Sequence, residues 1–323
     1  MRTFLFLLSI LSLTLITACG GSSARNNANN DANSSVTSSI SSSTSVSSRA
    51  SSSRSAQNTS VAYSRNLIHY GDASMQFGEL RLPVTSNDAP LPLVIIIHGG
   101  CWVTDFADYR FMDNFSAAIT ELGYVTWNIE YRAIGTGGEW PVIFQDIGQA
   151  IDYVETLAQN YAIDTTKVAI IGHSAGGHLA LWAASRQQIP SNSVLYKSNP
   201  LTIKGVISLA GIANVLGNNS CNTLANEVIG VPITEYNNNL FSRLNETSPL
   251  QMLPTNTKTI LISGSNDTIV PPAMGDEYSI NAIEKADESS HYIFQELDHF
   301  DLIDPNNSYW SFYEESLELL FLE

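Results

Sequence analysis

The sequence predicts an α/β fold in which a mostly parallel, doubly wound sheet carries helices on both faces. From about residue 61 onward, short apolar runs alternate with longer segments of helical periodicity. The run Leu91–His98 (LPLVIIIH) is almost continuously apolar, as expected of a strand that is buried on both faces. Buried parallel strands joined by helices are the pattern of a doubly wound sheet.

The individual elements can be placed along the chain in order. The predicted strands share an apolar or alternating pattern and cover Gln76–Pro83, Leu91–His98, Tyr124–Tyr131, Val168–Gly172, Gly205–Ala210, Thr259–Ser263 and Tyr292–Leu297. The predicted helices lie between or after them and cover Asp108–Leu122, Val142–Tyr161, Ala175–Arg186, Pro272–Lys285 and a final segment from about Ser308. Residues 212–253 interrupt the alternation and are rich in Asn, so we expect an insertion that caps or rims the functional site.

The first residues have the pattern of an export signal. Arg2 precedes an apolar run over residues 4–18, which is too short to span a membrane, so residues 1–18 are predicted to be a signal peptide. The sequence LITAC, which ends at Cys19, resembles the bacterial lipobox, in which cleavage precedes a cysteine that is then lipidated. The alternative is an ordinary signal peptide with a chance cysteine. We expect a lipoprotein of the bacterial cell envelope that contacts a membrane only through lipidated Cys19.

Residues 19–60 are predicted to be a linker, and residues 61–323 the catalytic domain. The linker is rich in Ser and Asn and has almost no large apolar residues. Such a segment cannot bury enough surface to offset its chain entropy, so it should form a flexible tether.

Charge and motif content exclude several kinds of partner. The chain has 15 Lys and Arg against 31 Asp and Glu, a net charge of −16, and it has no basic cluster. This balance argues against binding nucleic acid or anionic lipid through charge. There is no H-E-x-x-H motif, paired-cysteine motif or phosphate-binding glycine loop, so we expect neither a metal nor a cofactor.

Two cysteines remain in the predicted domain, Cys101 and Cys221. Disulfides persist in the compartments that exported proteins reach, so these two residues can form a bridge. Two free buried thiols are the alternative, and spacing alone does not decide between them.

A predicted nucleophile lies between a strand and a helix. The sequence GHSAG at residues 172–176 directly follows an apolar run and directly precedes the helical sequence GHLAL. This is the context that the G-x-S-x-G nucleophile elbow requires. Flanking glycines let the backbone turn sharply at Ser174, and the helix N-terminus stabilises negative charge that develops there.

A serine nucleophile needs a histidine that accepts its proton and a carboxylate that orients the histidine. Asp267 follows the predicted strand Thr259–Ser263, and His299 follows Tyr292–Leu297. Both therefore lie at carboxyl ends of strands, where ligands collect in open α/β sheets. We predict a triad of Ser174, Asp267 and His299.

Other residues compete for these roles. The competing histidines lie beside the elbow or outside the carboxyl-end loops: His69, His173, His178 and His291. The competing acids lie beside His299 or on the preceding helix: Asp276, Asp298 and Asp301. A loop carboxylate is more often a solvated turn residue, and placement at a strand end favours Asp267 and His299.

The sequence HGGCW at residues 98–102 follows the strand Leu91–Ile97. Paired glycines let backbone N–H groups approach a substrate carbonyl oxygen, and the amide of Ala175 supplies a further donor. Gly99, Gly100 and Ala175 are therefore the predicted oxyanion hole. A plain turn at the end of a strand is the alternative.

Together these motifs resemble those of α/β-hydrolase esterases, in which the triad occurs in the chain order Ser, Asp, His. The H-G-G-x-W sequence is similar to that of the kynurenine formamidase-like and hormone-sensitive-lipase-like branch. The resemblance covers about Leu80 to the C-terminus. It implies an α/β-hydrolase fold and the same triad and oxyanion residues.

The sequence thus predicts a serine esterase that cleaves small or carbohydrate-linked carboxylic esters through an acyl-enzyme, as a monomer. An arylformamidase, amidase or peptidase would use the same triad and is the alternative among enzymes. A non-catalytic binding module of the same fold is the alternative outside them.

Overall fold

The computed structural model describes residues 62–86 and 89–322. The predicted signal peptide, Cys19 and the linker lie outside these residues. By its internal contacts the chain divides into Met1–Ala56 and Gln57–Glu323, and the described residues belong to the second unit. Among the described helices, none is both long enough and apolar enough to cross a membrane.

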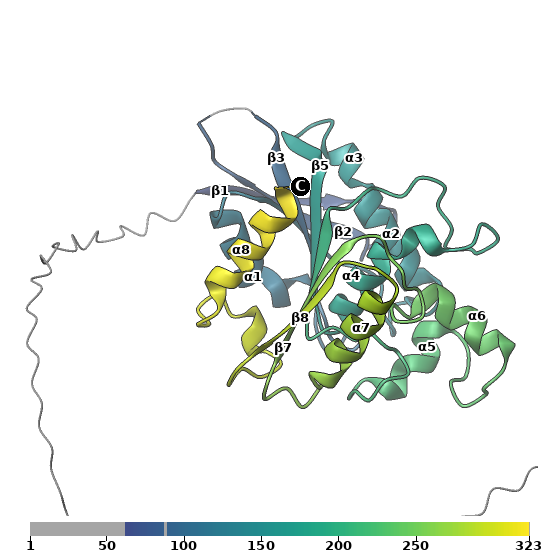
Figure 1. Ribbon diagram of the computed structural model, residues 1–323. Helices are drawn as coiled ribbons and strands as arrows, with labels where there is room; N and C mark the ends of the chain where they lie inside the picture. The colour runs from purple at the N-terminus through teal and green to yellow at the C-terminus, as the bar shows by residue number, and fades with distance from the viewer. Residues whose placement is uncertain (1–61, 87–88, 323) are drawn as a thin grey trace, which may run out of the picture. The chain divides into compact units, whose positions relative to one another are not determined.

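An eight-stranded sheet with the order β1-β2-β4-β3-β5-β6-β7-β8 forms the centre of this unit (Figure 1). Its strands are β1 (Tyr63–His69), β2 (Phe77–Pro83), β3 (Leu91–Ile97), β4 (Val125–Ile129), β5 (Ile163–His173), β6 (Gly205–Leu209), β7 (Lys258–Gly264) and β8 (Ser289–Phe294). The strands from β4 to β8 in this order are paired in parallel, whereas β1 and β2 join the edge in antiparallel pairs. The sheet is therefore mostly parallel, as predicted.

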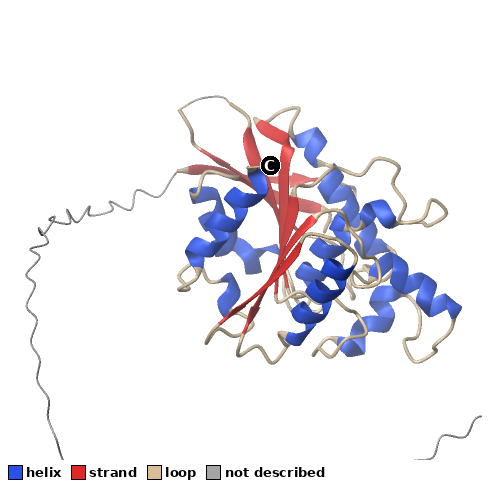
Figure 2. Ribbon diagram, in the orientation of Figure 1, coloured by secondary structure: helices blue, strands red, loops and turns tan. Residues whose placement is uncertain are grey.

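Helices cover both faces of the sheet (Figure 2). They are α1 (Asp113–Glu121), α2 (Val142–Asp152), α3 (Val154–Leu157), α4 (Ala175–Ala184), α5 (Ala225–Ile229), α6 (Asn238–Thr247), α7 (Ala273–Glu284) and α8 (Trp310–Phe321). On one face, Phe115 of α1 packs against Trp310 of α8. On the other, Phe144 of α2 packs against Trp182 of α4. The predicted doubly wound arrangement is confirmed.

The central strands supply the core. Every residue of β4 and of β6 is buried, and so are the last five residues of β3. Helices cover both faces of these strands, so neither face contacts water. This explains why the strand sequences are almost continuously apolar.

Several element boundaries differ from the prediction. The edge strand β1 was not predicted, because its residues alternate between exposed and half-buried and carry no apolar run. The predicted helix Val142–Tyr161 is divided at Tyr153, which separates α2 from α3. The predicted strand Tyr292–Leu297 ends at Phe294, since Glu296 has φ of 69°, a left-handed conformation that a strand cannot accommodate.

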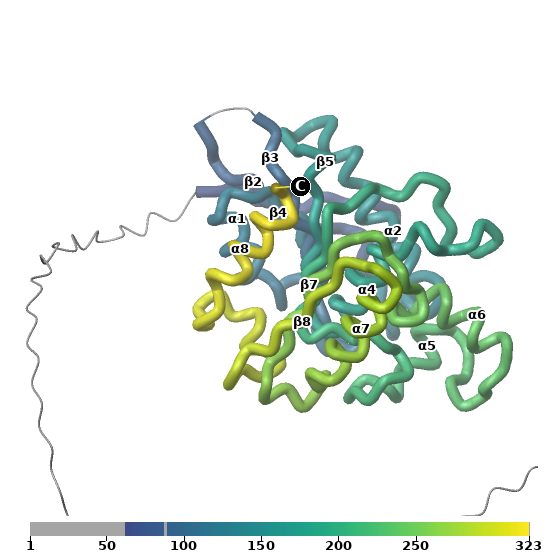
Figure 3. Tube along the Cα trace, in the orientation of Figure 1, coloured from purple at the N-terminus to yellow at the C-terminus, as the bar shows by residue number. Residues whose placement is uncertain are grey.

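The segment 212–253 is not an unstructured loop. It contains α5 and α6, and the Cα trace shows them beside each other at the side of the unit where α4 and α7 lie (Figure 3). The indole of Trp182 on α4 donates to Glu246 O near the end of α6, at 2.9 Å. The insertion is therefore fixed to the helix that follows the predicted nucleophile.

Candidate active site

Ser174 occupies the turn between β5 and α4 with φ of 57° and ψ of −119°. A non-glycine residue with positive φ is strained and persists only where its surroundings hold it. The flanking glycines show why the turn is so tight. A Cβ atom at Gly172 would lie 2.1 Å from Gly176 O, and one at Gly176 would lie 2.2 Å from Ile97 O. Only glycine fits at both positions, which accounts for the G-x-S-x-G spacing.

Asp267 and His299 form the hydrogen bond that a triad requires. His299 Nδ1 lies 2.7 Å from Asp267 Oδ2, and both residues are buried. The other carboxylate oxygen of Asp267 accepts from the amides of Ile269 and Val270, at 2.8 and 2.9 Å. Because the carboxylate accepts the Nδ1 proton, Nε2 of His299 is left as the basic nitrogen.

His173 joins the histidine loop to the elbow. Its Nε2 lies 2.8 Å from His299 O, and the centroids of the two imidazole rings are 4.6 Å apart. Burial, together with the neighbouring His299, lowers the pKa of His173 to about 3, so its ring is neutral and its Nε2–H donates to His299 O. Among the described residues no hydrogen bond joins Ser174 Oγ to His299, and such contacts often tighten only when substrate binds.

The predicted oxyanion loop lies against the elbow. A Cβ atom at Gly99 would lie 2.8 Å from His173 O and 2.9 Å from Ser174 Cβ. Within residues 62–86 and 89–322, the amides of Gly99, Gly100 and Ala175 donate to no other atom. Gly99 contacts Ser174, Gly100 follows Gly99 and Ala175 follows Ser174, so these free N–H groups are suited to an oxyanion hole.

His98 supports this loop, a role that the sequence did not predict. Its Nδ1 lies 2.8 Å from Gly99 O, and its Nε2 lies 3.0 Å from Glu130 Oε1. The ring of Tyr131 stacks on it at 4.4 Å, and the Tyr131 hydroxyl donates to His98 O. The signal that could have revealed Glu130 is a charged residue at the end of the buried strand β4.

The competing acids have other partners. Asp298 Oδ1 accepts from the amides of Phe300 and Asp301, and the amide hydrogen bonds, above all that of Asp301, lower the pKa of Asp298. Asp298 is therefore a turn residue of the histidine loop. Of the acids considered from the sequence, only Asp267 hydrogen-bonds to the His299 ring among the described residues.

A second Ser–His–Asp chain lies elsewhere in the unit. Ser263 Oγ is 2.9 Å from His291 Nε2, and His291 Nδ1 is 2.8 Å from Asp276 Oδ1. Ser263 is an interior residue of β7 rather than a turn residue, and the side chain of Asp276 is 56% exposed. This chain ties α7 to β7 and β8.

The structure joins Cys101 and Cys221 in a disulfide. Cys101 belongs to the HGGCW loop, and Cys221 belongs to the insertion 212–253. The insertion is therefore covalently attached to the predicted oxyanion loop.

Two exposed phenylalanines border the site. Phe300 is 52% exposed, and its ring centroid lies 5.2 Å from that of His299. Phe111 is 38% exposed and lies 5.8 Å from the ring of His173 and 6.2 Å from that of Phe300. These rings form an apolar rim that can contact a substrate next to His299.

The strand order, the helices on both faces and the serine elbow after β5 define the α/β-hydrolase fold. A model of the BD-FAE family matches residues 79–279, which is more than half of the chain. The protein belongs to the BD-FAE family.

The chain is also similar to individual proteins. It is 25% identical to esterase LipC of Mycobacterium tuberculosis over 151 residues, which are 46% of this chain and 36% of LipC. It is 34% identical to neutral cholesterol ester hydrolase 1 of Pongo abelii over 117 residues, 35% of this chain and 28% of that protein. The chain thus spans about a third of the length of these curated relatives.

Solved structures share the fold. A truncated carbohydrate esterase from gut microbiota superposes with a TM-score of 0.66 at 19% identity, over 83% of this chain and 99% of that chain.

Proposed function

We propose that this protein is a carboxylic ester hydrolase that works through an acyl-enzyme. The observation that carries the proposal is the buried Asp267–His299 hydrogen bond, which His173 joins to the Ser174 elbow. At that elbow Gly99 packs against Ser174, and the amides of Gly99 and Ala175 donate to no atom of the described residues. Esterase LipC and the cholesterol ester hydrolase, which share part of this sequence, support the same reaction.

In the proposed reaction, Ser174 Oγ attacks the ester carbonyl carbon while His299 Nε2 takes the hydroxyl proton. The carbonyl oxygen becomes an oxyanion that the amides of Gly99, Gly100 and Ala175 stabilise. Asp267 stabilises the imidazolium. The C–O bond to the alcohol then breaks, and His299 returns the proton to the leaving oxygen. His299 Nε2 then deprotonates a water molecule, which attacks the acyl carbon. The bond from that carbon to Ser174 Oγ breaks, His299 returns the proton to Oγ, and the acid is released.

For the substrate, we propose small or carbohydrate-linked esters. The structural relative named as a carbohydrate esterase supports this class. The apolar rim of Phe111 and Phe300 gives a surface on which a planar acyl group or the apolar face of a sugar ring can rest. An arylformamidase, amidase or peptidase reaction would use the same residues, so the substrate panel below includes N-formyl and amide compounds.

The test compares two serines of the same chain. Ser174→Ala is expected to reduce kcat for short p-nitrophenyl esters by about a million-fold. Ser263→Ala, which removes a serine from the second Ser–His–Asp chain, is expected to keep native kcat. A fluorophosphonate probe should label the native protein once per chain, at Ser174. Retained turnover by Ser174→Ala would contradict the mechanism, and absence of labelling would favour a binding module.

The substrate class is tested by measuring kcat/KM for acetylated sugars, feruloyl esters, long-chain esters, N-formyl aromatics and peptide amides. The proposal expects the highest values among small and carbohydrate-linked esters. A clear preference for N-formyl or amide compounds would contradict ester hydrolysis and favour an arylformamidase, amidase or peptidase.

We also propose that the mature protein is a monomeric lipoprotein of the cell envelope, anchored through Cys19. The proposal rests on the apolar run, the lipobox-like LITAC sequence and the Ser/Asn-rich stretch. Cys19→Ser should abolish incorporation of labelled palmitate and release the protein from the membrane fraction. A variant that stayed in the membrane and kept its lipid label would rule the anchor out.

A further inference from the structure

The loop that carries the proposed oxyanion hole has an unusual backbone. Gly100, Cys101 and Trp102 are three consecutive residues with positive φ, at 103°, 49° and 62°. Glycine adopts such angles readily, but cysteine and tryptophan do not. A loop of this kind holds its shape only if contacts outside it oppose relaxation toward ordinary angles.

One restraint comes from the helix that follows the nucleophile. The indole Nε1–H of Trp102 donates to His178 Nδ1 at 3.0 Å, and His178 Nε2–H donates to Thr247 O at 2.7 Å. Burial lowers the pKa of His178 to about 4, so its ring stays neutral and keeps Nδ1 free to accept. This chain fixes one end of the loop to α4 and to the end of α6.

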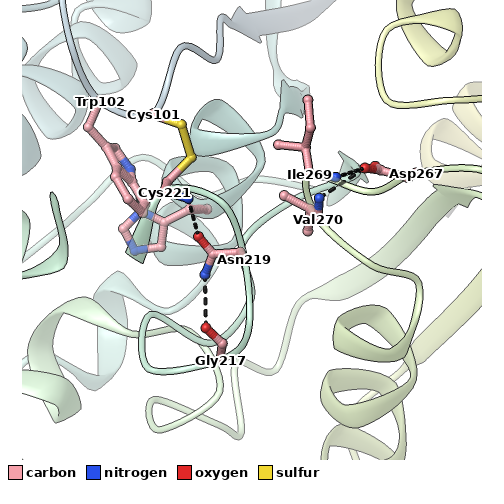
Figure 4. The surroundings of a disulfide bond; sticks show 9 residues. Cys101, Trp102, Gly217, Asn219, Cys221, Asp267, Ile269 and Val270 are labelled. Atoms are coloured by element: carbon pink, nitrogen blue, oxygen red, sulfur yellow. Dashed lines mark hydrogen bonds between the residues drawn. A yellow bond between two sulfur atoms is a disulfide. The ribbon is translucent and has the colours of Figure 1, made fainter. Parts of the chain in front are cut away.

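The second restraint is covalent and leads to the acid of the triad (Figure 4). Cys101 is bonded to Cys221, the residue after Ser220. The amide of Ser220 donates to Ile269 O at 2.9 Å. The amide of Ile269 in turn donates to Asp267 Oδ1 at 2.8 Å.

The cysteine is itself held firmly within the insertion. The amide of Cys221 donates to Asn219 Oδ1 at 2.9 Å, and Asn219 Nδ2 donates to Gly217 O at 3.1 Å (Figure 4). Cys221 is 1% exposed, whereas Cys101 is only partly buried. The bridge therefore has one rigid end, in the insertion, and one end in the strained loop.

We propose that the Cys101–Cys221 disulfide positions the oxyanion hole relative to the triad, so that Cys101 and Cys221 are positioning residues for ester hydrolysis. The inference rests on the proposed function. Cys101 follows Gly100 directly, so release of its side chain lets the loop relax and moves the two glycine amides away from Ser174. Oxyanion contacts are made in the transition state, so this displacement lowers kcat more than it raises KM.

The first test reduces the native protein. Dithiothreitol breaks the S–S bond, leaves two thiols on the protein and is itself oxidised to the cyclic disulfide. Alkylation and mass measurement then count the thiols. We expect kcat on a short p-nitrophenyl ester to fall by about 10- to 100-fold, less than the loss of an entire oxyanion donor, with little change in KM. Reoxidation should restore kcat.

A thionoester of the same acid and alcohol gives a readout that a purely structural role would not change. Its sulfur accepts hydrogen bonds weakly, so a well-placed oxyanion hole favours the oxygen ester. The ratio of kcat/KM for the oxygen ester to that for the thionoester should therefore fall on reduction. An unchanged ratio together with an unchanged kcat in fully reduced protein would overturn the proposal.

Two variants serve as controls. The Cys101→Ala/Cys221→Ala double variant should have the low kcat of the reduced protein and should not respond to dithiothreitol. Asp152→Asn, which removes an ion pair between α2 and the segment after α4, lowers stability away from the loop and should keep native kcat. If the Asp152→Asn variant, which keeps the disulfide, loses as much kcat as the reduced protein, the positioning role is wrong. If native protein hydrolyses no ester at all, the proposed function itself fails.

Discussion

Gly99 is the residue whose lack of a side chain matters most for the proposed chemistry. Its Cα packs so closely that an added Cβ would meet His173 O at 2.8 Å and Ser174 Cβ at 2.9 Å. Both contacts involve atoms that cannot move without distorting the elbow.

Gly99→Ala is therefore expected to push the loop away from Ser174 and lower kcat by about 100-fold or more, as for loss of an oxyanion donor. KM should change little. Steady-state kinetics on a p-nitrophenyl ester give both values, and circular dichroism checks that the fold is retained. Native kcat in a folded Gly99→Ala protein would contradict the assigned loop.

At this scale, the sequence predicted the residues that lie in loops directly after strands. Ser174, Asp267 and His299 could be chosen because the carboxyl ends of parallel strands meet along one edge. The residues that hold the proposed oxyanion loop in place could not be predicted in the same way. His98 and Glu130 are 32 residues apart and meet only because β3 and β4 are neighbours, and the disulfide depends on how the insertion folds.

Between elements, the most informative contact is the ion pair of Asp152 at the end of α2 with Arg186, which follows α4. Two hydrogen bonds of 2.9 and 2.7 Å join the groups, and Arg186 is only 6% exposed. Asp152 Oδ1 also accepts from the amide of Leu201, so one carboxylate connects α2, the segment after α4 and the segment before β6.

Asp152→Asn leaves the buried guanidinium without a counter-charge. We expect it to lower the free energy of unfolding by about 3 kcal/mol, near the low end for a broken buried pair, because Asp152 is partly exposed. Urea unfolding followed by circular dichroism measures this loss. Since the pair lies away from Ser174, kcat should equal that of the native protein, and a large drop in kcat would show that α2 influences the site.

The sequence predicted the strands that are buried on both faces, and it did not predict elements whose apolar pattern is weak. The strands from β3 to β7 stand out as apolar runs, and each was predicted to within a few residues, except that β5 begins five residues earlier than expected. The edge strand β1 offers no such run because solvent covers part of it. The break at Tyr153 is not visible in the apolar periodicity, because buried residues continue at helical spacing from Ile151 to Val154.

For the whole molecule, stability toward acid should depend on two buried neutral histidines. Burial is the main reason that the pKa of His178 falls from 6.5 to about 4 and that of His173 falls from 6.5 to about 3. The unfolded chain takes up protons on these residues near pH 6.5, whereas the folded protein does not. The free energy of unfolding should therefore fall as the pH decreases from about 6.5 toward 3.

His178→Asn tests this dependence. Between pH 6.5 and 4 the native protein should lose about 3 kcal/mol through His178, and the variant should lose correspondingly less. Urea unfolding at several pH values gives the slope. His69→Asn, which removes an exposed histidine of the edge strand, should leave the slope unchanged. Equal slopes for native protein and His178→Asn would show that His178 is not the source.

The two Ser–His–Asp sets of this molecule contain the same functional groups, and each has a histidine hydrogen-bonded to an aspartate; within the described residues, only Ser263 is also hydrogen-bonded to its histidine. Ser263 lies in a regular strand, whereas Ser174 lies at a strained turn against which Gly99 packs. In the proposed mechanism, the feature that separates the structural serine Ser263 from the nucleophile Ser174 is therefore the conformation of the main chain. Grafting a histidine and an aspartate beside a strand serine would reproduce the side chains of a hydrolase without creating a nucleophile, so a designer has to build the turn first.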